Sequence, residues 1–565
     1  ISKITLTYQL QPNKINILPF KDDVREYPLP HKYYEENNLH AFLLESINDY
    51  DSALKNHTDI FTPQYNAVEF TLNDETSTLS NEKLILKQKF KKQLTPELLE
   101  KAYYSGRYAQ LCSSGVSTQR LYGMWIGEWC ASWGSKYTMD ANVNLQTSSM
   151  NTGNIECAPI GYVNFILRQV ADWEENALAT HGFTDAIQAP VHTDGEMAGL
   201  IESCYPYPFR YWNAGADWML QPIFETIQCY GDMQIPLSDE FDLYELKSVL
   251  SLTEEDLTDE EIQKIIDKGY LDLKTEVLLP LLIKSVNYWD QLLTPEYYTT
   301  ADGGIHYEKG KTTLSDGETY CIVPSYSPEN NPANYGNPST ANCAIDISAC
   351  RDNINMLISV LKDIDENADV SYYEQLIADL PPYLYDGTGA LKEWATTEFE
   401  ENNMHRHLSH LYLAWPLFET QDNEELKNAS IQAILNRESE NEASHALVHR
   451  SLIAARLKDS QSVNDALMGL MSKRIYYTSL MTNHHTNRES GYCTDFGIGY
   501  LGIINECLVY SNVGEIEILP AVPTTGFEKG SISGIVARTR AEVTNLQWDY
   551  SSKTATVTIK SQIDQ

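Results

Sequence analysis

The hydrophobic pattern of this chain takes on the helical period near residue 95 and keeps it until about residue 509. Thr95 followed by Pro96 is a typical helix start, because proline is well tolerated at the first helical position. Apolar stripes at helical spacing then cover residues 98–111, 162–173, 218–227, 278–289, 354–364 and 463–470. So many separate amphipathic segments predict a mainly α-helical protein.

Long polar segments separate these stripes, at residues 128–158, 185–215, 300–345 and 385–410. Loops of this length inside a compact domain usually carry function. Helices joined in this way fit a helical toroid whose loops build a cleft at one end.

Alternation at period two marks both ends of the chain. It appears in Ile4–Leu10 and Ala67–Leu72, and again in Glu515–Leu519 and Thr554–Ile559, where glycines separate the runs. A chain of 565 residues is too long for one ordinary core. We therefore expect a remnant β-domain and linker over residues 1–90, a helical catalytic domain over 91–509 and a small C-terminal β-domain over 510–565.

Composition excludes several classes of partner. The net charge of −38 repels phosphate backbones, so we expect no nucleic-acid binding and a neutral substrate. No apolar run is long enough to span a membrane. The ten cysteines form no CxxC pair, which excludes zinc ribbons and predicts mostly buried thiols. The start has neither a signal peptide nor an initiator Met, so the cellular address stays open, with a secreted or cell-surface location favoured over a cytoplasmic one.

One candidate acid lies in the segment 386–410. Glu393 follows a glycine-rich turn and precedes Trp394, and an apolar neighbour raises the pKa of a carboxyl group, as general acid catalysis requires. His405, His407 and His410 follow. The alternative is a surface glutamate beside a metal-like histidine cluster. The His-x-His spacing lacks the helical pattern of a zinc site, so we expect no metal.

Two further segments could complete such a site. Asp495 stands between apolar residues and glycines, which predicts a buried, firmly held carboxylate; the alternative is a helix N-cap. Asn142 and Asn144 are two apart, so they would share one side of an extended stretch, where their amides could orient a water molecule. A turn or cap is the plainer interpretation of that pair.

At these segments the sequence resembles glycoside hydrolase family 95, the α-L-fucosidases and α-L-galactosidases. The resemblance runs from about residue 40 to the end, and the joint order of its motifs makes it specific. Its motifs include Tyr104–Ser114, Leu121–Trp125, His192–Asp194, Tyr211–Trp218, Pro324–Asn330, Gly389–Trp394, His405–His410 and Leu519–Pro523.

The resemblance implies an (α/α)6 barrel flanked by β-domains, and hydrolysis with inversion at the anomeric carbon. It implies Glu393 as general acid and Asp495 as base, with Asn142 and Asn144 positioning the attacking water. The substrate-binding residues that it implies are His192, Asp194, Trp212, Trp394, His405, His407 and His410. We therefore expect an enzyme that removes terminal α-L-fucosyl residues from oligosaccharides or glycans without a cofactor.

Three departures leave the exact sugar open. The family usually has Asp-Gly-Asn-Phe-Gly at the base, where this chain keeps only Asp495 and Gly499; Thr147–Met150 and Gly195–Glu196 differ from the family as well. One alternative is an α-L-galactosidase, or another α-L-glycosidase, on the same site. A phosphorylase or lyase is disfavoured, because a phosphate site needs basic residues and only Arg488 lies near Asp495. The non-enzymatic alternative is a carbohydrate-binding protein with a decayed site.

Overall fold

The structure is a computed structural model. It describes Leu44 and residues 49–73, 77–123, 132–195, 197–199, 207–237, 258–437, 443–473, 475–485 and 491–563. The predicted strand Ile4–Leu10, Trp125, Glu196 and Arg488 lie outside these residues.

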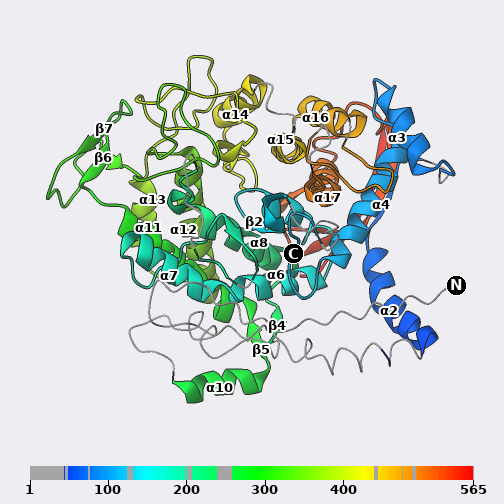
Figure 1. Ribbon diagram of the computed structural model, residues 1–565, viewed down its shortest axis with the longest axis horizontal. Coiled ribbons are helices and arrows are strands. Elements are labelled where there is room, and N and C mark those ends of the chain that lie inside the picture. Colours follow the sequence, from blue (N-terminus) through cyan, green and yellow to red (C-terminus); the bar gives the residue numbers. More distant parts are fainter. Residues whose placement is uncertain are drawn as a thin grey trace.

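The described chain is mainly helical, which confirms that part of the prediction (Figure 1). Its α-helices are α2 (Tyr50–Tyr65), α3 (Asn81–Lys89), α4 (Pro96–Cys112), α5 (Asn142–Thr147), α6 (Cys157–Leu167), α7 (Val170–His181), α8 (Gly215–Tyr230), α10 (Asp259–Lys268), α11 (Leu279–Leu292), α12 (Ala344–Ile364), α13 (Ser371–Ala378), α14 (Glu424–Asn436), α15 (Ser444–Arg456), α16 (Ser460–Ser472) and α17 (Asp495–Leu508). Shorter helical turns are η1 (Ser132–Ser135), η2 (Phe209–Tyr211), η3 (Leu273–Leu278) and η4 (Ser409–Leu411).

Local sequence signals explain several helix starts. Thr258 and Glu261 form a capping box at the start of α10: the Thr258 side chain accepts from the Glu261 backbone N–H, and the Glu261 carboxylate accepts from the Thr258 backbone N–H. Helix α4 begins at Pro96 as predicted, but the Thr95 hydroxyl donates to Gln88 Oε1 instead of capping the helix. The predicted stripe 162–173 is divided between α6 and α7, which meet at residues 168–169.

Short antiparallel strands accompany the helices. A five-stranded sheet joins β1 (Glu69–Thr71), β11 (Lys529–Ser533), β13 (Ala541–Asp549) and β12 (Ile535–Ala537) in that order, with β14 (Thr554–Ser561) also on β13. Segments from both sides of the helical region thus share one sheet, because Phe70 in β1 pairs with Ile532 in β11. The other strands are β2 (Tyr137–Thr138), β3 (His192–Thr193), β4 (Gln234–Pro236), β5 (Tyr270–Asp272), β6 (Tyr297–Thr299), β7 (Ile305–Tyr307), β8 (Thr319–Tyr320), β9 (Val509–Asn512) and β10 (Glu515–Ile518).

Helix α17 lies at the centre of the packing. It contacts α4, α5 and α15, and all of its residues except Gly497 are buried. A helix that is apolar on every side belongs in a core, so its first residue, Asp495, is held deep in the protein. Among the described residues, no helix has the length and apolar character that a membrane span requires.

Candidate active site

Asp495 occupies the first position of α17, and its side chain is fully buried. One carboxylate oxygen accepts from Asn142 Nδ2 at 2.7 Å, and the other accepts from Gln146 Nε2 at 3.0 Å. Burial raises the pKa of this carboxyl group to about 6, although both amide donors act to lower it. The prediction of a buried, held carboxylate at Asp495 is therefore confirmed.

The segment that carries the two asparagines is helical, so the expected extended stretch is wrong. Residues Asn142–Thr147 form α5, and in a helix two residues that are two apart point in different directions. Asn142 faces Asp495, whereas Asn144 Nδ2 lies 3.4 Å from the Trp218 carbonyl oxygen in α8. Helix α5 therefore places Asn142 and Gln146, which are four residues apart, next to the carboxylate of Asp495.

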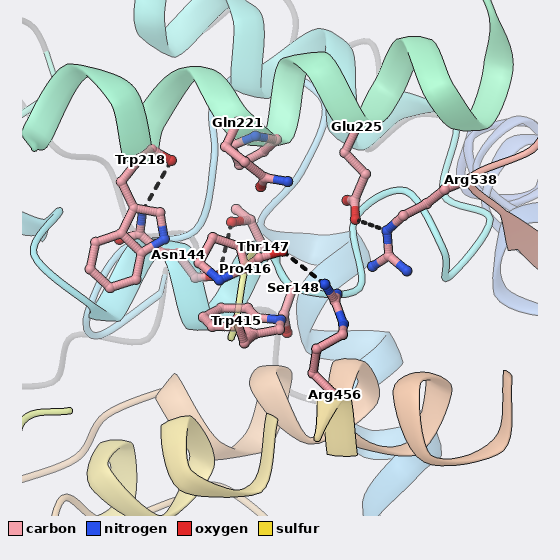
Figure 2. Close-up of a pocket in the computed structure, with 11 residues that line it drawn as sticks. Asn144, Thr147, Ser148, Trp218, Gln221, Glu225, Trp415, Pro416, Arg456 and Arg538 are labelled. Carbon is pink, nitrogen blue, oxygen red and sulfur yellow. Dashed lines mark hydrogen bonds and ion pairs between the residues drawn. The ribbon is translucent and has the colours of Figure 1, made fainter. Parts of the chain in front are cut away.

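Asn144 instead borders a small internal cavity of about 20 Å³ between α5, α8 and the 415–416 turn (Figure 2). That volume accommodates one water molecule. Among the described residues, Asn144 Oδ1 has no hydrogen-bond partner, and a water in the cavity would satisfy it. Arg456 and Arg538, which are ion-paired with Glu506 and Glu225, line the far end.

Glu393 is also fully buried, but its surroundings differ from the apolar environment expected beside Trp394. Its carboxylate accepts from Ser327 Oγ at 2.6 Å and Asn330 Nδ2 at 2.7 Å, and it pairs with Arg437 at 2.8 Å. These three donors hold the carboxylate in one orientation. They come from parts of the chain far from Glu393, which explains why the neighbouring residues did not reveal them.

A second carboxyl group lies beside Glu393. Glu401 accepts from the Glu393 backbone N–H at 2.8 Å. Burial, followed by the negative charge of Glu393, raises the pKa of Glu401 to about 7. This part of the site therefore retains a proton close to neutral pH.

A cluster of buried histidines connects the surroundings of the two carboxylates. His445 and His484 approach Asp495, with ligand atoms within 4.8 Å of one another, and the two imidazole rings stack at 5.1 Å. His445 in turn packs edge-on against His407 at 5.2 Å. Burial holds the pKa values of His407 and His445 well below the usual range, so both imidazoles are neutral near neutral pH.

His407 leads to the loop that holds Glu393. His407 Nε2 lies 3.6 Å from Glu329 Oε2. Glu329 stands between Ser327 and Asn330, the two residues that donate to Glu393. Asp495 therefore lies beside the histidine cluster, and Glu393 is connected to the cluster through the 327–330 loop.

Asp140 joins this cluster through residues just before α5. Ligand atoms of Asp140, Glu329 and His407 lie within 4.8 Å of one another, and the Asp140 side chain is 1% exposed. Arg406 forms an ion pair with Glu329. Burial, with a further contribution from the charge of Glu329, raises the pKa of Asp140 well above its usual value.

The other predicted substrate-binding residues are spread around this cluster. Thr138 Oγ1 and His192 Nδ1 lie 3.2 Å apart across the β2–β3 pair, and burial lowers the pKa of His192 to about 4. His410 Nδ1 lies 3.2 Å from Arg437, the partner of Glu393. His405 packs on His407 at 5.2 Å.

The two predicted tryptophans and Asp194 are less directly tied to the carboxylates. Trp212 and Trp394 are fully buried, and neither indole N–H has a hydrogen-bond partner among the described residues. Asp194 is exposed and accepts from the Met197 backbone N–H at 2.7 Å. The structure therefore brings the histidines together with Glu393 and Asp495 more closely than it does these three residues.

Two groups of side chains have the spacing that a cation could bridge: His445, His484 and Asp495, and Asp140, Glu329 and His407. In the first group, Asn142 and Gln146 already donate to Asp495. In the second group, Arg406 already supplies a positive charge to Glu329. We assign no metal to either group, because both also have the chemistry of a sugar-binding site.

Sequence reasoning missed several residues of this site, namely Asp140, Gln146, Ser327, Glu329, Asn330, Arg437, His445 and His484. Asp140 and Gln146 stand two and four residues from Asn142, so a helical interpretation of that segment would have drawn attention to Gln146. Arg437 and His445 lie in stretches with no distinguishing pattern. Only the packing of α14 and α15 brings them to the site.

Comparison with known proteins shows which family the chain is similar to. The family model for the glycosyl hydrolase family 95 catalytic domain matches residues 49–265 and 290–508. Alpha-L-fucosidase 2 of Arabidopsis thaliana is 26% identical over 239 residues, which make up 40% of this chain and 28% of the plant protein. The chain thus aligns with less than a third of that relative's length. From the match to the family model over most of the chain, we conclude that this protein belongs to glycoside hydrolase family 95.

Proposed function

We propose that the protein is an inverting α-L-fucosidase that removes terminal α-L-fucosyl residues from oligosaccharides or glycans. Membership of a glycoside hydrolase family already implies a glycan substrate. The observation that supports the finer proposal is that Asp495 lies beside a buried histidine cluster to which the 327–330 loop connects Glu393. The name of the plant relative supports fucose as the sugar.

In this mechanism the protonated form of Glu393 gives its proton to the leaving oxygen as the glycosidic bond breaks, and Asp495 accepts a proton from the water that attacks the anomeric carbon. Ser327, Asn330 and Arg437 orient Glu393. Asn142 connects the water to the base, since its amide donates to Asp495 and its oxygen can accept from water. We propose a catalytic role for Asn144 as well, in positioning the attacking water.

We further propose that the helices form an (α/α)6 barrel over residues 91–509, with a remnant β-domain and linker over 1–90 and a small β-domain over 510–565. The buried central helix α17, which packs against α4, α5 and α15, supports this arrangement. In such a barrel the loops between helices would bear the substrate residues, as the 324–330 and 393–410 loops do for Glu393.

The alternative sugar is α-L-galactose, which differs from fucose by a hydroxyl group at C6. A pocket that merely crowds or tolerates one hydroxyl discriminates by only about 10- to 200-fold. Side-by-side rates on aryl α-L-fucoside and aryl α-L-galactoside therefore decide the preferred sugar. A higher kcat/KM for the galactoside would reverse our assignment.

Proton NMR of the first sugar released tests the mechanism directly. We expect the β-anomer to appear first from an α-L-fucoside, because water attacks from the face opposite the leaving group. Initial release of the α-anomer would show retention and would remove Asp495 from its role as base.

Glu393→Gln tests the general acid. Since glutamine cannot donate the catalytic proton, we expect kcat on natural glycans to fall by about 10²–10⁴-fold while sugar binding persists. Aryl substrates with a good leaving group should lose much less. Glu398→Gln, on the same loop but exposed to solvent, is the matched control. Full activity of Glu393→Gln on natural glycans would refute the assignment.

A further inference from the structure

The carboxyl group of Asp140 is buried without a protein partner. Its side chain is 1% exposed, and neither oxygen has a hydrogen-bond partner among the described residues. Nearly all buried polar groups in proteins are hydrogen-bonded, because leaving one unpaired costs free energy. A group of this kind beside the histidine cluster is therefore expected to receive its partner from a bound ligand.

The protonation state of Asp140 depends on the charged and polar groups that surround it. They are Glu329, Arg406, His407 and Tyr326, and the ligand atoms of Glu329, His407 and Asp140 lie within 4.8 Å of one another. Tyr326 OH is also buried and has no hydrogen-bond partner among the described residues. The neighbouring side chains of Asp140 and Tyr326 therefore both have hydrogen-bonding atoms without a partner among the described residues.

Of the two carboxyl groups Asp140 and Glu329, only Glu329 has a positively charged partner in an ion pair among the described residues. Arg406 pairs with Glu329, and His407 is neutral because burial lowers its pKa. A second carboxylate at Asp140 would be buried beside Glu329, and Arg406, the cation that acts on Asp140 among the described residues, already pairs with Glu329, so the second charge is strongly unfavourable. Glu329 is therefore the ionised member of this pair, and Asp140 keeps its proton.

We propose that Asp140 is a neutral carboxylic acid that contacts the substrate sugar, donating its O–H to one sugar oxygen and accepting from a sugar hydroxyl, with Tyr326 OH beside it. This inference rests on the proposed function for the identity of the ligand. It specifies a neutral polyhydroxylated ring, because the carboxylate of an acidic sugar would be repelled by Glu329.

Infrared difference spectroscopy tests the protonation of Asp140 without relying on activity. We expect the wild type at neutral pH to show the carbonyl stretch of a protonated carboxyl group that Asp140→Asn lacks. Asp302→Asn, which changes an exposed carboxylate whose pKa is lowered mainly by the Thr300 hydroxyl, should leave that band intact. If Asp140→Asn and wild type have the same band, Asp140 is ionised and the proposal is wrong.

Adding free L-fucose or L-galactose tests the contact. Either sugar should shift the Asp140 band, since a new hydrogen bond weakens the carbonyl stretch. If the wild type hydrolyses an aryl fucoside but neither sugar moves the band, the contact is refuted while the proposed function stands. If no α-L-glycoside is hydrolysed, the proposed function fails, and the band alone decides the protonation state.

Enzyme kinetics tests whether a conservative substitution of Asp140 preserves activity. Asparagine can donate and accept in place of a neutral acid, so Asp140→Asn should keep kcat/KM within about threefold of wild type, whereas Asp140→Ala should lose about tenfold to a hundredfold, mainly through KM. The comparison is made between variants with wild-type unfolding temperatures. An Asp140→Asn enzyme as impaired as Asp140→Ala would show that a carboxylate is required and would overturn the proposal.

Discussion

At the scale of single residues, Asp495 illustrates how burial and hydrogen bonding oppose each other. Burial raises its pKa to about 6, while the amides of Asn142 and Gln146 stabilise the ionised form. The Asp495 carboxyl group, our proposed base, is therefore ionised above about pH 6 and becomes protonated below it. Its two donors belong to α5, one helical turn apart.

We expect kcat/KM to fall as the pH drops through about 6, because protonated Asp495 cannot accept a proton from water. Asn142→Ala removes a donor to the ionised form, so this midpoint should move up by roughly one unit, and kcat should fall. The pH dependence of initial rates on an aryl glycoside provides the measurement.

Asn144→Ala is the comparison for Asn142, because both residues lie on α5 while only Asn142 contacts Asp495. We expect the Asn144 variant to leave the midpoint of the acid limb in place. Equal shifts in both variants would show that Asn144 also acts on the base, as the sequence predicted.

At the scale of elements, the position of α17 depends on close helix contacts at glycine. A Cβ atom at Gly106 in α4 would collide with the Gly497 carbonyl oxygen in α17. That oxygen belongs to the backbone of the helix that begins with Asp495, so it cannot rotate away. The absence of a side chain at Gly106 thus sets how closely α4 approaches the helix that carries the base.

Gly106→Ala should therefore destabilise the fold by about 1–3 kcal/mol, the usual cost of overpacking, and should lower activity if α17 shifts. Urea unfolding followed by circular dichroism measures the first effect. Gly469→Ala in α16 is the matched control, because its Cβ would meet only the Leu447 side chain, at 3.2 Å. Equal stability of the Gly106 and Gly469 variants would contradict this account.

At the scale of the whole molecule, a buried charge network ties the C-terminal strands to the helices. Arg538, next to β12, pairs with Glu225 in α8 and with Glu506 in α17, and Glu506 also pairs with Arg456 in α15. Of these side chains, Glu225, Arg456 and Arg538 border the cavity beside Asn144 (Figure 2). Breaking a buried pair leaves an uncompensated charge, which is far more costly than losing an exposed pair.

Arg538→Leu should reduce the free energy of unfolding by about 3–5 kcal/mol, because Glu225 and part of the charge of Glu506 lose their partner. Arg540→Leu, two residues away on the exposed side, should change it by less than about 0.5 kcal/mol. Chemical denaturation of both variants measures the difference. Similar losses would mean that the network does not hold the sheet to the helices.

Much of the helical pattern was predictable, since amphipathic periodicity reports which face a helix buries. The stripes at 218–227 and 354–364 lie in α8 and α12, and the capping box at Thr258 starts α10. The prediction was wrong at Asn142–Thr147, where every residue of α5 is buried. A short segment buried on all sides has no amphipathic period, so the sequence did not distinguish a helix from an extended strand.

By itself, the sequence determined the helical class and the glycoside hydrolase family, because these follow from local periodicity and from the order of motifs along the chain. The same motifs indicated Glu393 and Asp495 as the catalytic carboxylates that we propose. Only the tertiary structure decided which groups surround them. Arg437 at Glu393, His445 at Asp495 and Glu329 beside Asp140 come from distant segments. Their charges and proton positions depend on burial and on distances through space, and no linear pattern records either quantity.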